Sequence, residues 1–159
     1  MEIEEIYERY GNKLIRIAYR ITQNEADSWD ILHDSVLEFI KRKPNGKPLN
    51  YLTKTIVNKS INFVKKKRHL ELREIGINDS PQKTMEKEEI RKIVKAGIKR
   101  LEPIERSVLV LKKYENMTHK QISKILDITP ENSRIILYRS LEKLKFFLMP
   151  AFNKKRREL

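Results

Sequence analysis

Apolar side chains recur three or four positions apart through most of this 159-residue chain. This spacing places them on one face of a helix, whereas a half-buried strand would need strict alternation of apolar and polar residues. The helical stripes are Ile3, Ile6, Tyr7, Tyr10, Leu14, Ile17, Ala18 and Ile21; Trp29, Leu32, Val36, Phe39 and Ile40; Leu49, Leu52, Ile56, Ile61 and Val64; Ile90, Ile93, Val94, Ile98 and Leu101; and Ile104, Val108 and Leu111. The sequence has no strand-type alternation and therefore predicts an all-α fold.

Capping and helix-breaking residues set the ends of the first three helices. The first helix should end near Thr22, and Asn24 is suited to cap a second helix that runs to Arg42. The segment 43–48 contains two prolines and a glycine, which cannot sit together inside a helix. A third helix should follow this breaker and run into the basic residues 65–68. Three such helices can share one small core.

Residues 69–88 differ in character from the segments on either side. They hold three basic and five acidic residues, a formal charge of −2, and include the turn-forming segment 78–81. A mildly acidic, turn-rich stretch between basic helical segments is typical of a linker, and its first residues can also continue the third helix. The predicted organisation is a helical domain at 1–68, a linker at 69–88 and a second helical domain at 89–159.

The second domain contains the signal of a helix-turn-helix. Thr118 and Gln121 have the spacing of a capping box, so a helix should start at Thr118, with its buried face at 122, 125 and 126. A short turn at 127–129 leads to Thr129 and Pro130, a cap followed by proline at the first position of the next helix. That helix carries polar and basic residues in its first half, as a DNA-reading helix does. A structural helix pair with solvated arginines is the alternative.

Charge and composition narrow the function. The formal net charge of +13 favours a polyanionic partner such as nucleic acid. The chain has no cysteine, which excludes disulfides and thiolate sites and fits a reducing cytoplasm. The acidic start of the chain is neither a signal peptide nor a membrane span. The three histidines are far apart in sequence and no catalytic motif is present, so we expect neither an enzyme nor a cofactor.

The second domain resembles the promoter-binding region four of extracytoplasmic-function (ECF) sigma factors. The resemblance lies in the L-x-P-x-x-R-x-V pattern from Leu101 to Val108 and the M-T-x-x-x-I-S-x-I-L pattern from Met117 to Leu126. It implies that the last helix reads an upstream promoter element, with base or phosphate contacts from Arg134 and Arg139 and Lys120 on the DNA backbone. The full set of expected DNA-binding residues in this domain is Lys120, Asn132, Ser133, Arg134, Tyr138 and Arg139.

The first domain is similar to the family in its acidic segment 27–36, D-S-W-D-I-L-H-D-S-V. In the family this segment docks on core RNA polymerase. Asp27, Asp30 and Asp34 are three and four positions apart, so they share one helical face, and with His33 they are the expected polymerase-binding residues. A solvated acidic face is one alternative; a divalent metal cluster is another, but the segment lacks the glycine-bearing loop of a calcium site.

The breaker loop and the third helix match the parts that open promoter DNA and hold its downstream element in the family. Amide groups at Asn58 and Asn62 suit base edges, and Lys65 and Lys66 suit phosphates. Tyr51, where the family usually has tryptophan, is expected in the core. The chain departs from the family at several positions, which indicates an unusual promoter preference; they are Val57, Asn62, Asp127, Ile135 and Ile136.

The resemblance implies a cytoplasmic transcription initiation factor with core RNA polymerase and promoter DNA as partners. An anti-sigma protein is a further expected partner. The alternative functions are a stand-alone helix-turn-helix regulator that binds DNA without polymerase and a sigma-like accessory factor. A basic membrane-binding helix is suggested by the aromatic residues 146, 147 and 152 beside the basic segment 154–157, but we expect those aromatics in the core and no stable membrane insertion.

Overall fold

The computed structural model describes residues 1–71 and 86–158 of the chain, and every regular element within these ranges is helical. The N-terminal elements are α1 (Ile3–Ile6), the π-helical turn η1 (Tyr7–Gly11), α2 (Asn12–Thr22), α3 (Glu25–Arg42) and α4 (Pro48–Glu71). The C-terminal elements are α5 (Glu86–Lys99), α6 (Pro103–Leu109), the π-helical turn η2 (Val110–Tyr114), α7 (His119–Leu126) and α8 (Pro130–Glu158). The predicted all-α fold is confirmed.

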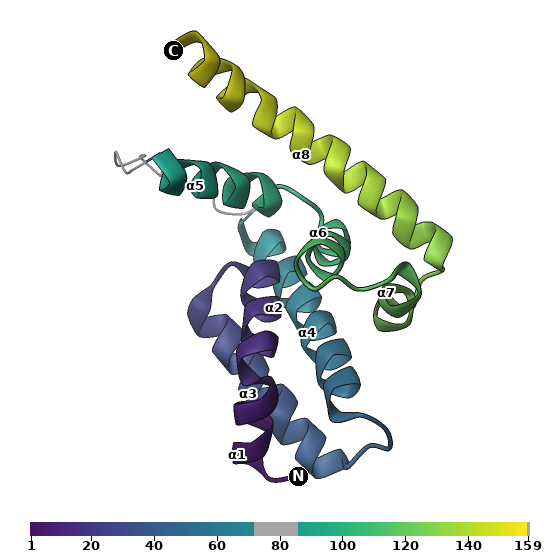
Figure 1. Ribbon diagram of the computed structural model, residues 1–159. Helices are drawn as coiled ribbons and strands as arrows, with labels where there is room; N and C mark the ends of the chain where they lie inside the picture. The colour runs from purple at the N-terminus through teal and green to yellow at the C-terminus, as the bar shows by residue number, and fades with distance from the viewer. Residues whose placement is uncertain (72–85, 159) are drawn as a thin grey trace.

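The N-terminal module is a bundle of α2, α3 and α4 (Figure 1). Thr22 ends α2, and the Asn24 side chain then accepts a hydrogen bond from the Asp27 amide at 3.0 Å, as the sequence predicts for an N-cap. Lys43 ends α3 in the left-handed conformation, with φ 44°, and the breaker loop separates it from α4. The bundle core is fully buried; its largest members are Ile6, Leu14, Ile17, Ile21, Leu32, Leu52 and Ile56.

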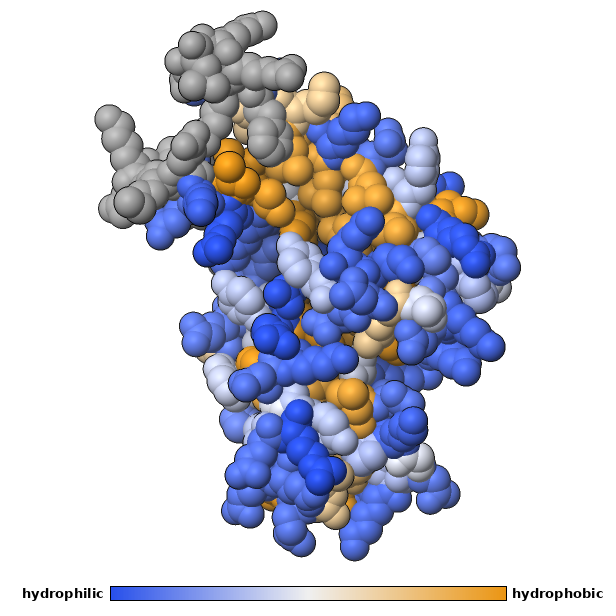
Figure 2. Space-filling view, in the orientation of Figure 1, coloured by the Kyte–Doolittle hydropathy of each residue, from blue (hydrophilic) through white to orange (hydrophobic). Residues whose placement is uncertain are grey.

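The C-terminal module is the predicted helix-turn-helix with two further helices. Pro103 opens α6 inside a capping box formed by Glu102 and Glu105. Thr118 caps α7 reciprocally with Gln121, so α7 itself begins one residue later than predicted. The long helix α8 packs on α5, α6 and α7 (Figure 1). Figure 2 shows apolar surface between α5 and α8, over a small cluster of Ile98, Leu101, Leu109 and Leu144.

The two modules pack against each other, a contact that the sequence did not predict. Four buried residues of the second module, Val108, Val110, Leu111 and Ile122, belong to the same apolar cluster as the N-terminal core. The α4 helix contacts both α6 and α7, and α2 contacts α6 and η2. In this structure the modules therefore form one closed body.

The linker prediction is only partly described by the structure. The α4 helix continues to Glu71, as the sequence allowed, and α5 begins at Glu86, so both ends of the predicted linker are helical. Residues 72–85 lie outside the described residues, and the exact domain boundaries stay predictions.

Candidate nucleic-acid interface and acidic helix face

The first half of α8 presents most of the predicted DNA-binding residues to solvent. Thr129 Oγ1 accepts a hydrogen bond from the Asn132 amide at 3.1 Å, which fixes the start of the helix. Asn132, Arg134 and Arg139 are exposed, and Tyr138 is 67% exposed. The only ion pair of Arg134 with a described residue is Glu131, at 3.9 Å between two exposed side chains. Such a pair holds the guanidinium weakly, so Arg134 is available for a phosphate or a base.

Ser133 does not belong to this surface. Its side chain is fully buried, and its hydroxyl lies 2.8 Å from His119 Nδ1 on α7. The prediction that Ser133 contacts DNA is wrong in this structure, because the residue fixes α7 against α8 instead. Burial lowers the pKa of His119, and the positive charges of Lys112 and Arg134 lower it further. Lys120, the next residue on α7, is exposed, as a contact with the DNA backbone requires.

The two isoleucines of the recognition helix have different environments. Ile136 is half-buried and packs against the core, whereas Ile135 is 47% exposed beside Arg134. An apolar side chain at this position offers a methyl contact rather than a hydrogen bond. Ile135 is therefore a candidate contact that the sequence indicates only as a departure from the family.

The acidic face of α3 lies on the N-terminal module. Asp30, His33 and Asp34 are exposed, and Asp27 is half-buried near the helix start. The salt bridges between described residues include neither Asp30 nor Asp34, so both carboxylates are open to a basic partner. Within the described residues, no cluster of acidic, histidine or cysteine side chains could hold a metal ion.

An aromatic group stands beside these acids. The Trp29 ring stacks on His33 with centroids 6.0 Å apart, and the Tyr7 hydroxyl is hydrogen bonded to His33 Nδ1. Trp29 is 42% exposed and Leu37 is 49% exposed. Its spacing predicts that Trp29 belongs to the buried stripe, and this prediction is wrong because the ring turns outward onto His33. Exposed aromatic and leucine side chains beside unpaired acids are typical of a protein-binding face.

The predicted DNA face of α4 has its side chains on one side of the helix. Asn58 is half-buried, and Asn62, Lys65 and Lys66 are exposed. Tyr51 is half-buried, packs against Phe39 at 5.7 Å between ring centroids, and donates a hydrogen bond to Glu38, which supports the core assignment. Val57 is fully buried, so this departure from the family adds to the core rather than to a binding surface.

Lys54 extends this α4 face by one turn, because it precedes Asn58 by four residues. Its Nζ lies 3.1 Å from the Asp127 carboxylate in the turn of the helix-turn-helix. The sequence gives no signal for Lys54, since only the tertiary structure shows that the turn rests against the predicted DNA face of the other module. In the closed arrangement the turn therefore contacts one end of that face, and the Lys54 side chain stays 44% exposed.

Comparisons with family models and with a curated protein both match this chain to sigma factors. A family model described as Sigma-70 region 2 matches residues 6–70, and one described as Sigma-70, region 4 matches residues 91–144. The ECF RNA polymerase sigma factor SigM of Bacillus subtilis is 24% identical over 157 residues, covering 91% of this chain and 94% of SigM.

The fold is similar to that of a solved sigma factor. The sigma factor RpoE of Bartonella quintana, in a co-crystal structure with the anti-sigma factor NepR, has a TM-score of 0.68 at 11% identity. The match covers 92% of this chain and 96% of RpoE. No helix within the described residues has the length and apolar character needed to cross a bilayer.

Proposed function

Since this chain belongs to the sigma-70 family, as an ECF RNA polymerase sigma factor, we propose that it holds promoter DNA at two points while α3 binds core polymerase. Members of this family bind core RNA polymerase and promoter DNA, and they direct the enzyme to promoters without catalysing a reaction of their own. The chain has the two regions that this task needs, in the order that the family has them. Its place of action is the cytoplasm, where the polymerase works.

The upstream contact is assigned to the first half of α8. Its exposed Arg134, Tyr138 and Arg139 reach outward from a helix whose start is fixed by a side-chain cap, which is the observation that carries the proposal. Arginine can bond the O6 and N7 acceptors of guanine in the major groove, and an apolar side chain can contact the thymine methyl group. We therefore assign a thymine contact to Ile135. The contact from Ile135 is apolar where the family usually has a polar one, so the promoter sequence that α8 prefers should differ from the family's usual one.

The downstream contact is assigned to α4. Asn58 and Asn62 offer amide donors and acceptors to unstacked bases. Lys65 and Lys66 bind the phosphate backbone of the adjoining DNA. In the closed arrangement the Asp127 turn contacts the Lys54 end of this face, so we infer that the modules separate when both promoter contacts form. The breaker loop at 43–47 lies just before α4, where it can receive a base that leaves the stack.

The acidic face of α3 is assigned to core polymerase. Asp30, His33 and Asp34 are exposed and lie beside Trp29 and Leu37. The two carboxylates provide charge for the interface, and Trp29 and Leu37 provide apolar area. Charged groups steer the encounter, and a partly exposed aromatic ring contributes most when the partner buries it. The N-terminal module therefore serves polymerase and DNA on different helices.

Transcription from a genomic fragment library with purified core polymerase tests this function. We expect initiation at a subset of fragments that share two short elements at a fixed spacing. Failure both to bind core and to initiate on any fragment would contradict the proposal. A mobility-shift assay without core polymerase distinguishes a sigma factor from a stand-alone regulator. A stand-alone regulator would form a specific complex with duplex DNA by itself.

A further inference from the structure

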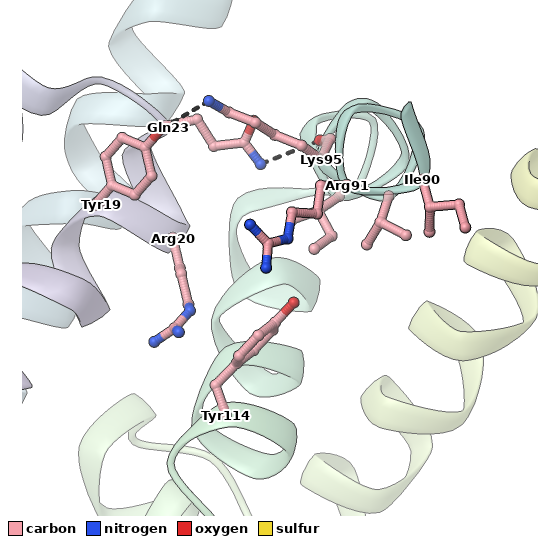
Figure 3. Close-up of a pocket in the computed structure, with 9 residues that line it drawn as sticks. Tyr19, Arg20, Gln23, Ile90, Arg91, Lys95 and Tyr114 are labelled. Carbon is pink, nitrogen blue, oxygen red and sulfur yellow. Dashed lines mark hydrogen bonds between the residues drawn. The ribbon is translucent and has the colours of Figure 1, made fainter. Parts of the chain in front are cut away.

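An open cavity of about 220 Å³ lies at the junction of the two modules. Its walls come from α2 of the N-terminal module and from α5 and η2 of the C-terminal module (Figure 3). We propose that this cavity binds a small aromatic monocarboxylate, and that the bound molecule holds the two modules together. The inference concerns a ligand site that neither promoter nor polymerase binding requires.

A cation that has no partner among the described residues faces the cavity. Arg91 forms no hydrogen bond or ion pair with any residue that the structure describes, and its guanidinium points toward the same space as the Tyr114 hydroxyl (Figure 3). An arginine fork bonds a carboxylate through two parallel N–H donors. Lys95 already directs one of its three N–H donors to the Tyr19 hydroxyl at 2.7 Å. Arg91 is therefore the expected anion ligand.

A second guanidinium is held in position at the other side. Arg20 lies over the Tyr114 ring, 4.2 Å from its centroid, and pairs with the Glu115 carboxylate at 3.6 Å. The Glu115 side chain is only 8% exposed, so its negative charge is poorly screened by solvent. The Glu115 charge therefore offsets that of Arg20. Arg91 is left as the guanidinium without an acidic partner among the described residues, which matches a ligand with a single carboxylate.

The remaining wall and the size of the cavity define the body of the ligand. Ile90, Val94 and Ile98 lie along one face of α5 and line the cavity. An engineered apolar cavity of about 150 Å³ holds a benzene molecule. The cavity in this chain is therefore large enough for one ring and a carboxylate, and it is smaller than the sites of drug-sized ligands, which begin at about 300 Å³.

Binding at this position has a mechanical consequence. Because Arg20 and Tyr19 belong to α2 while Arg91, Val94 and Ile98 belong to α5, the complete cavity exists only when the modules are in contact. A ligand that binds only the closed arrangement shifts the population toward it. It therefore acts against the separation of modules that promoter binding needs.

Ligand-observed fluorine NMR on the full chain, without polymerase or DNA, tests the site. The probe is 4-fluorobenzoate, and uncharged 4-fluorobenzyl alcohol measures the contribution of the carboxylate. We expect saturable binding of the acid and at least tenfold weaker binding of the alcohol, because a hydrogen-bonded charge pair contributes about 1.5–3 kcal/mol. Arg91→Met should weaken the binding of 4-fluorobenzoate by a similar factor. Lys99→Met, which removes an exposed cation on the same helix outside the cavity, should leave this binding unchanged.

A second variant keeps the test independent of the arginine. Ile90 is 37% exposed, so Ile90→Trp can fill the cavity without a large effect on the fold, and it should also abolish binding. The proposal is overturned if wild type shows no saturable binding of 4-fluorobenzoate, or if Arg91→Met and Ile90→Trp bind it as wild type does. Because the assay contains no DNA or polymerase, either result leaves the proposed sigma-factor function untouched.

Discussion

The Arg106 guanidinium donates a hydrogen bond to the backbone carbonyl of Ile21 at 2.6 Å, across the junction of the two modules. The same side chain donates to the carbonyl of Lys99 at 2.7 Å and is only 2% exposed. Burial, and then the nearby charge of Arg68, lower the pKa of Arg106 to about 10. The cation remains protonated at neutral pH and links α2 to the C-terminal module.

Replacing this arginine should weaken the junction. Arg106→Leu removes the donors and leaves the buried carbonyls without partners, so we expect the free energy of unfolding to fall by about 1.5–3 kcal/mol. Denaturant titration followed by circular dichroism measures the change. Arg16→Leu, at an exposed position on α2, is the matched control and should stay within about 0.5 kcal/mol of wild type. Equal losses for both variants would show that Arg106 has no special role.

The burial of His119, together with the nearby charges of Lys112 and Arg134, makes stability depend on pH. The pKa of His119 is lowered in the folded chain, so below its ordinary value of 6.5 the unfolded chain binds more protons than the folded one. Stability should therefore be complete above pH 6.5 and fall as the pH drops through 6.5 toward the lower folded pKa. Melting temperatures of wild type and His119→Asn at pH 7.5 and 5.5 measure this effect. The melting temperature of His119→Asn should fall less on acidification than that of wild type. An equal fall in both proteins would contradict the assignment of this pH dependence to His119.

Local sequence signals predicted the helix boundaries well. The caps at Asn24, Thr118 and Thr129 and the proline at 103 act within one turn of helix, so their residues alone determine where a helix begins. Most of the expected DNA and polymerase residues also lie at the surface, because polar residues opposite an apolar stripe face solvent.

The predictions from sequence that were wrong or missing depend on tertiary contacts. Ser133 is polar and small, and only its distance from His119 explains why it is buried. Trp29 fits an apolar stripe by spacing, but it leaves the core for the His33 ring. The junction was not predicted, because the spacing of its apolar residues does not show which module they pack against. Its buried arginine bonds backbone carbonyls, which have no periodic pattern in the sequence.

Charge reversal at the junction should open the closed arrangement. Glu115 pairs with Lys13 at 3.9 Å and Arg20 at 3.6 Å, and Glu115→Lys would bring three cations together in a poorly solvated position. We expect the radius of gyration from small-angle scattering to increase while helix content is kept. Asp127→Lys, at a left-handed position with φ 53°, removes the Lys54 pair, whose side chains are 44% and 78% exposed, so its effect on the radius of gyration should be smaller. An unchanged radius in both variants would mean that these charges do not close the molecule.

The recognition helix can be tested on duplex DNA that carries a mapped upstream element. Arg134→Ala should weaken promoter binding by the holoenzyme by about 1–3 kcal/mol if the guanidinium reads a base, and the loss should be specific to one position of the element. Ser133→Ala is the internal comparison, because its hydroxyl faces His119 rather than DNA. It should lower stability and leave sequence preference unchanged. A uniform loss across all sequences would assign Arg134 to phosphate.

The acidic face of α3 should determine affinity for core polymerase. Asp30 is exposed and unpaired among the described residues, so Asp30→Arg should leave the fold intact while it repels the basic partner surface that the carboxylate is expected to meet. We expect at least tenfold weaker binding to core by fluorescence anisotropy, with an effect that shrinks at high salt because screening reduces repulsion. Glu142→Arg, an equal charge change at an exposed position of α8, should bind core normally. Wild-type affinity for Asp30→Arg would remove this residue from the interface and leave Trp29 and Leu37 as its expected centre.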